Sequence, residues 1–197
     1  MNDKNKMMDW NDDHLMSSIE TPLREDAFEL DEDMKMELIE QKFQEIMQVM
    51  GLDLTNDSLR NTPKRVAKMF VKEIFSGLNP ANKPSVSLFD NHYHYKQMLV
   101  EKDINVSSTC EHHFLPITGY AHIGYIPEDK VIGLSKINRL VDYYSHRPQV
   151  QERLTLQILK DLQETLETKN VIVIINAKHL CVSSRGIKDK NSSTTTI

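Results

Sequence analysis

Residues 104–125, INVSSTCEHHFLPITGYAHIGY, contain two stretches in which apolar and polar side chains alternate, on either side of a turn rich in cysteine and histidine. Alternation with a period of two is typical of a β-strand that buries one face. We therefore predict antiparallel strands over residues 104–108 and 119–125, connected by the segment that carries Cys110, His112 and His113.

Similar short stretches of alternating apolar and polar residues occur elsewhere in the chain. Further strands are predicted at residues 86–89 and 93–101, and a last one, rich in Val and Ile, at residues 170–181. Helical periodicity predicts helices over residues 31–50, 135–144 and 150–166, and another that starts with Thr62 as N-cap and Pro63 as first helical residue and stops before Gly77. The order ααββββααβ predicts an α+β fold with helices packed on one face of an antiparallel sheet.

Composition indicates a globular chain of ordinary size. Its 197 residues carry 24 basic and 29 acidic side chains, a net charge of -5. Residues 1–33 hold eleven acidic and three basic side chains, which leaves the remaining residues 18 acidic and 21 basic, a sum of +3. This charge is too sparse for a nucleic-acid-binding stripe, but it allows one focused anion pocket.

The sequence also excludes a membrane-spanning protein. The longest apolar run covers residues 171–175, whereas a spanning helix needs roughly 20 apolar residues. The first residues, MNDKNKMMDWNDD, lack the apolar core of a secretory signal, so we expect a cytoplasmic protein. Two cysteines in a reducing compartment are core thiols, metal ligands or nucleophiles rather than a disulfide framework.

Three segments follow from these patterns. Residues 1–25 are polar and aperiodic, and we expect them to form a mobile acidic arm. A helical segment is predicted over residues 26–80, and the sheet with its covering helices over residues 81–197.

Residues that can bind a metal or transfer protons are most concentrated at Cys110-Glu111-His112-His113. A second such group, His179 and Cys181, lies far away in the sequence. Cysteine and histidine are preferred zinc ligands, although a buried cysteine often acts only as a small apolar residue. If the last strand continues through Cys181, then His179 and Cys181 share a face. Three protein ligands would leave a coordination position for water, as in catalytic zinc sites, with the two other histidines nearby as proton carriers.

Cationic side chains form a second group. Positions three apart on a helix are neighbours, and a helix start favours anions. Each pair could be an ordinary solvated face, but together the residues suggest a polyphosphate pocket. The group comprises Ser135, Lys136 and Arg139 on one predicted helix, Arg65 and Lys68 on another, and Arg185 after the last strand.

Gln151 and Glu152 start the long helix that follows Pro148. An acidic residue in a first turn usually complements the helix dipole. A carboxylate there could instead accept two hydrogen bonds from a guanine edge, and the sequence alone leaves both readings open.

Taken together, these residues resemble the zinc-dependent GTP cyclohydrolase I family. The likeness runs from about residue 20 to residue 196 and is carried by four stretches in order: SLRNTPKRVAKMF (58–70), STCEHHFLPI (108–117), VIGLSKINRLVDYYSHRPQVQERLT (131–155) and HLCVSSRGIKDKNSSTTT (179–196). The resemblance implies a tunnelling fold (T-fold), with residues 81–197 as its catalytic domain. In such a fold, sheets from several subunits join into a barrel, here a homodecamer built as a dimer of pentamers.

The resemblance also implies roles for individual residues. Cys110, His113 and Cys181 match the zinc ligands, His112 and His179 match the acid/base pair, and Glu152 with Gln151 matches the guanine contact. Ser135 belongs to the catalytic group at the ribose and triphosphate. The remaining substrate contacts are Lys136, Arg139 and Arg185, with Arg65 and Lys68 reaching in from a neighbouring subunit.

The implied activity is the hydrolysis and ring rearrangement of GTP to 7,8-dihydroneopterin triphosphate and formate, the first step of folate and tetrahydrobiopterin synthesis. Two alternatives are another tunnelling-fold pterin or deazapurine enzyme and a non-catalytic, zinc-stabilised module. One departure from the family is that the sequence ends at Ile197, where relatives continue with a Gly- and Phe-containing segment and a closing helix. We expect this departure to affect packing between subunits more than the zinc ligands.

Overall fold

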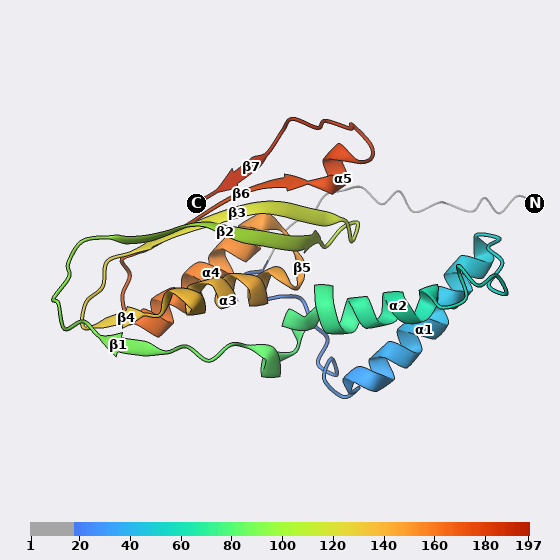
Figure 1. The fold of residues 1–197 in the computed structure, drawn as a ribbon, viewed down its shortest axis with the longest axis horizontal. Helices are drawn as coiled ribbons and strands as arrows, with labels where there is room; N and C mark the ends of the chain where they lie inside the picture. The colour runs from blue at the N-terminus through green and yellow to red at the C-terminus, as the bar shows by residue number, and fades with distance from the viewer. Residues whose placement is uncertain (1–17) are drawn as a thin grey trace, which may run out of the picture.

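The computed structural model describes residues 18–197 and shows a helical pair beside a sheet-and-helix body (Figure 1). The pair is formed by α1 (Glu32–Val49) and α2 (Thr62–Met69). The body contains α3 (Leu134–Ser145) and α4 (Gln151–Leu166), and a single turn, α5 (Leu180–Ser183), follows the last long strand. Both helices of the body lie against the same face of the sheet, as the sequence predicts.

The main sheet has five strands in the order β5-β2-β3-β6-β7. The long strands are β2 (Leu99–Cys110), β3 (Pro116–Tyr125) and β6 (Val171–His179), and they pair in antiparallel fashion. Two short strands complete the sheet, β5 (Pro148–Gln149) parallel to β2 and β7 (Thr194–Thr196) antiparallel to β6. A separate ribbon pairs β1 (Leu88–Asp90) with β4 (Lys130–Ile132). The predicted α+β fold with an antiparallel-rich sheet is confirmed.

The core lies between the sheet and its two covering helices. Alternate residues of β2, β3 and β6 point inward, and one stripe each of α3 and α4 meets them. Fully or nearly fully buried side chains from the strands include Val106, Ile117, Ala121, Ile123 and Ile175, and those from the helices include Ile137, Leu140, Leu154, Ile158 and Leu162. Cys110 belongs to this core and Cys181 packs against it, so the two thiols lie at its edge.

The predicted strands at 93–101 and 104–108 are wrong in their bounds. Residues 93–98 form no strand, and the rest belongs to the single strand β2, whose register shifts between Glu101 and Ile104. Asp103 sits in this irregularity with φ of 58°, and its backbone N–H donates to Nδ1 of His122 across the hairpin. The bulge restores the alternation on the far side, so Ile104 and Val106 still face the core.

The second helix also departs from the prediction. The α-helix begins at Thr62 itself, with Asn61 as its N-cap, and it changes into a π-helix over Phe70–Ile74 before a 3-10 turn at Ser76–Leu78. In the π-turn the N–H of Phe75 bonds the carbonyl of Phe70 at 3.1 Å. This spacing places both rings on one side, 5.5 Å apart, where each also packs edge-on against Phe114.

The expected mobile arm covers residues 1–25, of which residues 1–17 lie outside the described part. The segment that follows is held on α4. Arg153 Nε donates to the carbonyl of Ser18 at 2.9 Å, and Gln157 Nε2 donates to the carbonyl of Ile19 at 2.8 Å. Residues 18–19 are therefore anchored on the domain. Within residues 18–197, no helix has the length and apolar character needed to cross a bilayer.

Gly119 in β3 provides a test of the strand packing. A Cβ atom at this position would lie 2.1 Å from the carbonyl oxygen of Asn176 and 2.5 Å from Cα of Ala177, both backbone atoms of β6. We expect Gly119→Ala to force the strands apart and to cost about 3 kcal/mol or more, which corresponds to a melting temperature lower by roughly 6–12 °C. Gly133→Ala, where a Cβ meets only ordinary contacts of 3.5 Å and beyond, is the control. Equal melting temperatures for the two variants would contradict the packing described.

Candidate metal centre and active site

The central strand β3 brings two distant parts of the chain to one place. Its first residues pair on one side with the end of β2, where Thr109 lies opposite Pro116, and on the other with the end of β6, where His179 lies opposite Ile117. Antiparallel pairing on both sides therefore places Cys110 and His179 near the same end of the sheet.

Cys110, His113 and Cys181 meet at this end. One ligand-type atom from each residue lies within 4.8 Å of the other two, and no other such group of metal-binding side chains occurs within residues 18–197. Cys110 is the last residue of β2, and the turn after it is closed by hydrogen bonds between Cys110 and the backbone of Phe114 (2.9 Å) and Leu115 (2.8 Å). That turn places His113 on the same side as the thiol.

Cys181 reaches the cluster by a different route from the one the sequence predicts. Strand β6 ends at His179, and Cys181 lies in the helical turn α5, so the two residues do not share a strand face. The carbonyl of Leu180 accepts hydrogen bonds from the backbone N–H (2.9 Å) and the hydroxyl (2.6 Å) of Ser184, which stabilise the turn. The helical turn α5, rather than strand alternation, places the Cys181 thiol near Cys110.

The donor set suits a borderline-soft cation. Two thiols and one imidazole within this distance match the ligands that zinc prefers. Burial, and then the nearby Cys110 thiol, raise the pKa of Cys181, so this cysteine favours the neutral form until a cation is bound. Arg185 contacts Nε2 of His113 at 2.7 Å, and since a guanidinium can only donate, this nitrogen accepts the hydrogen bond.

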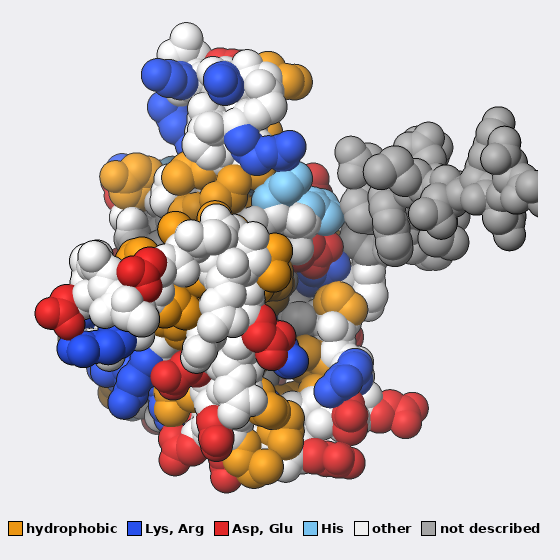
Figure 2. Space-filling model, turned by 90° about the vertical axis from the view of Figure 1, so that its right-hand side faces the viewer, with side chains coloured by type: hydrophobic (Ala, Val, Ile, Leu, Met, Phe, Trp, Pro, Cys, Tyr) orange, Lys and Arg blue, Asp and Glu red, His pale blue; other side chains and the backbone are white. Residues whose placement is uncertain are grey.

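His112 lies beside the cluster with its Nδ1 3.8 Å from the Cys110 sulfur. It is exposed, and it lines a cavity of about 330 Å3 together with Thr21, Glu111 and Phe114. In Figure 2 histidine side chains form a surface patch on this side of the molecule, next to basic and acidic side chains. A group bound in this cavity would therefore contact an imidazole ring close to the candidate metal ligands.

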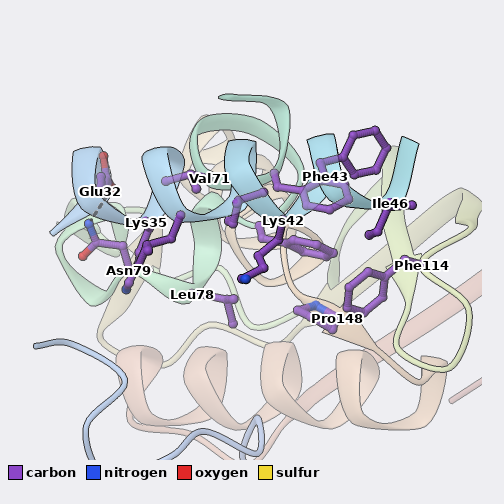
Figure 3. Close-up of a pocket in the computed structure, with 14 residues that line it drawn as sticks. Glu32, Lys35, Lys42, Phe43, Ile46, Val71, Leu78, Asn79, Phe114 and Pro148 are labelled. Carbon is purple, nitrogen blue, oxygen red and sulfur yellow. Dashed lines mark hydrogen bonds between the residues drawn. The ribbon is translucent and has the colours of Figure 1, made fainter. Parts of the chain in front are cut away.

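A larger cavity of about 570 Å3 adjoins the first, and the two share Leu78, Phe114 and Pro148 (Figure 3). Its other wall is α1, from which Phe43 and Ile46 contribute side chains. The larger cavity is mainly apolar and lacks all three residues of the cluster. Its chemistry therefore differs from that of the candidate metal centre.

The side chain of His179 is hydrogen-bonded to that of Gln151. Its Nε2 lies 2.8 Å from Oε1 of Gln151, while burial lowers its pKa and Glu152 acts in the opposite direction. The family resemblance implies a substrate contact for Gln151, whose side chain is buried in this structure, with 1% of the residue exposed. Glu152, its neighbour, is exposed.

An ion pair that the sequence analysis missed supports the turn that carries Cys110 and His113. Arg153, whose side chain is 3% exposed, pairs with the carboxylate of Glu111 through both terminal nitrogens of its guanidinium. Glu111 lies between Cys110 and His112. Its position inside this Cys/His motif is the one sequence feature that could have indicated a role for its carboxylate at the site. The pair ties the turn to the first turn of α4.

The basic side chains predicted to bind phosphate lie farther apart than Cys110, His113 and Cys181 do. Arg185 contacts His113, as described, whereas Ser135, Lys136 and Arg139 lie in the first turns of α3. Arg139 lines a separate cavity of about 210 Å3 with Asp142 and His146. Arg65 and Lys68 are exposed on α2, in the projecting helical pair. The chain thus gathers the candidate metal ligands but not the whole set of predicted phosphate contacts.

Comparison with known proteins gives a consistent result. A sequence model of GTP cyclohydrolase I matches residues 39–197. GTP cyclohydrolase 1 of Flavobacterium johnsoniae is 60% identical over 185 residues, which cover 94% of this chain and 83% of that protein. The GTP cyclohydrolase 1 proteins of Erwinia tasmaniensis and of Escherichia coli O1:K1 are each 54% identical over 178 residues, covering 90% of this chain and 80% of the relative.

The buried ion pair predicts a large effect of a small change. Glu111→Gln leaves the guanidinium of Arg153 buried without a counter-charge, and breaking such a pair costs about 3–5 kcal/mol. We expect lower thermal stability and weaker metal retention, measured by calorimetry and by metal content after dialysis. Glu45→Gln, which breaks the exposed pair with Lys42, is the matched control and should change neither. If both variants behave alike, the pair does not support the turn.

Proposed function

Because the chain belongs to the GTP cyclohydrolase I family, we propose that Cys110, His113 and Cys181 hold a zinc ion at the active site of a GTP cyclohydrolase I. The observation that carries this proposal is the meeting of two thiols and one imidazole within 4.8 Å, at the end of the sheet where His112 and His179 also lie. Zinc in a site with three protein ligands acts as a Lewis acid and lowers the pKa of water, which supplies a nucleophile at neutral pH.

The substrate is GTP, and the chain's own side chains bind and orient it. Lys136, Arg139 and Arg185 are fixed charges for the triphosphate, and Ser135 sits at the start of α3 for the ribose. Arg65 and Lys68, exposed on the projecting α2, complete the phosphate contacts from a neighbouring subunit. These groups do not react, so their binding energy serves to position the guanine base.

Glu152 selects the base. Its carboxylate is exposed at the start of α4, next to the residue that holds His179. A carboxylate can accept two parallel hydrogen bonds from the ring N–H and the exocyclic amine of guanine, an edge that adenine lacks. The same residue thus determines which purine is brought to His179.

His112 and His179 move the protons. Protonation of guanine N7 makes C8 electrophilic, and an imidazole beside it can deliver that proton and later accept one as the five-membered ring opens. Two hydrolytic steps at C8 release formate and consume two water molecules. The ribose then opens and rearranges to a ketose, and condensation with the freed amine returns one water and gives 7,8-dihydroneopterin triphosphate.

This product is the starting pterin for folate and tetrahydrobiopterin. We further propose that the protein works in the cytoplasm as a homodecamer of two pentamers, because part of its phosphate-binding set lies on the projecting helices. The alternatives of a different tunnelling-fold enzyme and of a non-catalytic zinc module receive no support from the three relatives described above, each of which bears the name GTP cyclohydrolase 1.

The function is tested by incubating the purified protein with GTP and measuring formate and a fluorescent pterin. We expect equimolar products, loss of both on chelation and recovery with zinc. Cys181→Ala should lower pterin formation at least about 100-fold and reduce the zinc content while keeping the circular dichroism of the folded protein. Val182→Ala in the same helical turn is the control and should remain active. Full activity of Cys181→Ala without zinc would refute the assignment.

The guanine contact is tested separately with Glu152→Gln. Replacing a charged double acceptor by an amide that also donates should raise the KM for GTP about 10–100-fold, the effect of losing hydrogen bonds to a charged group. Glu164→Gln, on an exposed position of the same helix, is the control. Unchanged binding of GTP in Glu152→Gln would exclude the carboxylate from guanine recognition.

A further inference from the structure

The side-chain amide of Gln151 is enclosed by partners whose hydrogen-bonding roles are fixed. Its Nε2 lies 3.0 Å from the carbonyl oxygen of Ile175 in β6, 3.0 Å from that of Thr194 in β7 and 3.1 Å from Oγ1 of Thr196. Carbonyl oxygens can only accept, so the NH2 group must face them. The reversed amide would set its own oxygen against two carbonyl oxygens in a site that is 1% exposed.

The orientation of the amide determines what it offers to His179. With the NH2 group committed to the strands, Oε1 is the atom that faces Nε2 of His179 at 2.8 Å. An amide oxygen only accepts, so Nε2 of the imidazole must carry a hydrogen and donate it. A neutral imidazole has one N–H, and Nδ1 is therefore the nitrogen with the lone pair.

We propose that Gln151 is a positioning residue that fixes the neutral ring of His179 as the Nε2–H tautomer and leaves Nδ1 as the atom that exchanges protons with the substrate. The inference rests on the proposed function, in which His179 is a proton carrier. Gln151 then makes no contact with guanine, because three acceptors already surround its two amide hydrogens and its oxygen is bound to His179.

The arrangement connects the active site to the last strand of the chain. Thr196 accepts from Gln151 and lies 2.7 Å from Oγ1 of Thr155, whose hydroxyl also bonds the carbonyl of Gln151 at 2.9 Å. Strand β7 and the first turn of α4 thereby hold the amide in a single orientation. A His179 ring free to flip or to change tautomer would present the wrong atom in part of the molecules.

Two substitutions at Gln151 separate positioning from simple packing. Gln151→Met removes both the donor and the acceptor. Gln151→Glu, in its protonated form, keeps a carbonyl oxygen that accepts from Nε2–H and has one O–H that can donate to the strand carbonyls in place of the amide. We expect Gln151→Met to lower kcat about 10–100-fold with little change in the KM for GTP and Gln151→Glu to recover much of that loss.

The tautomer itself is measured by solid-state 15N NMR of zinc-loaded protein labelled at histidine, with His179 assigned by its absence in His179→Asn. The wild type and Gln151→Glu should show a protonated Nε2 and an unprotonated Nδ1 at neutral pH, and Gln151→Met a mixture. A wild-type ring protonated at Nδ1 alone would overturn the proposal, even if the variants failed to fold.

The kinetics offer further ways to contradict it. Equal loss of kcat in both variants would show a structural role only, and a raised KM with unchanged kcat would return Gln151 to the substrate contacts. If the wild-type protein formed no formate or pterin while the predicted tautomer was present, the proposed function would fail and the positioning of His179 would stand.

Discussion

The arrangement of the candidate site depends on the pairing of β3 with a neighbour on each side. Its first residues hold the end of β2 through the pair Thr109 and Pro116 and the end of β6 through the pair Ile117 and His179. Cys110 and Cys181 are 71 positions apart in sequence, and this pairing, together with the helical turn after His179, brings their sulfurs together. A shift of register by one residue in either pairing would turn the inward residues outward and separate the cluster.

The first turn of α4 packs against the candidate site and contacts both parts of it. Gln151, Glu152 and Arg153 are consecutive, so on a helix they point in three directions roughly 100° apart. Gln151 holds His179, Arg153 holds the turn that carries Cys110 and His113, and Glu152 is left exposed to the solvent side. One helical turn thus connects the two halves of the candidate metal centre and carries Glu152, the residue proposed to bind guanine.

The sequence predicts much of this arrangement because its signals are local. The period-two pattern of residues 104–108 and 119–125, the N-terminal signal at Pro63 and the C-x2-H spacing each depend on neighbouring residues. The bulge at Asp103, the π-turn at Phe70–Ile74 and the helical turn at Cys181 escape prediction because each satisfies a contact made elsewhere in the chain. The ion pair of Glu111 with Arg153 and the orientation of Gln151 also depend on distant partners, 42 positions away for Glu111.

The central claim is that two thiols and one imidazole from two distant parts of the sequence hold a zinc ion and leave room for a further ligand. Zinc K-edge X-ray absorption of the metal-loaded protein tests this claim most directly, because it identifies the donor atoms. The account predicts two sulfur scatterers and one imidazole nitrogen from the protein, with a light-atom ligand completing the shell. A shell without sulfur, or one filled by four protein side chains, would contradict it.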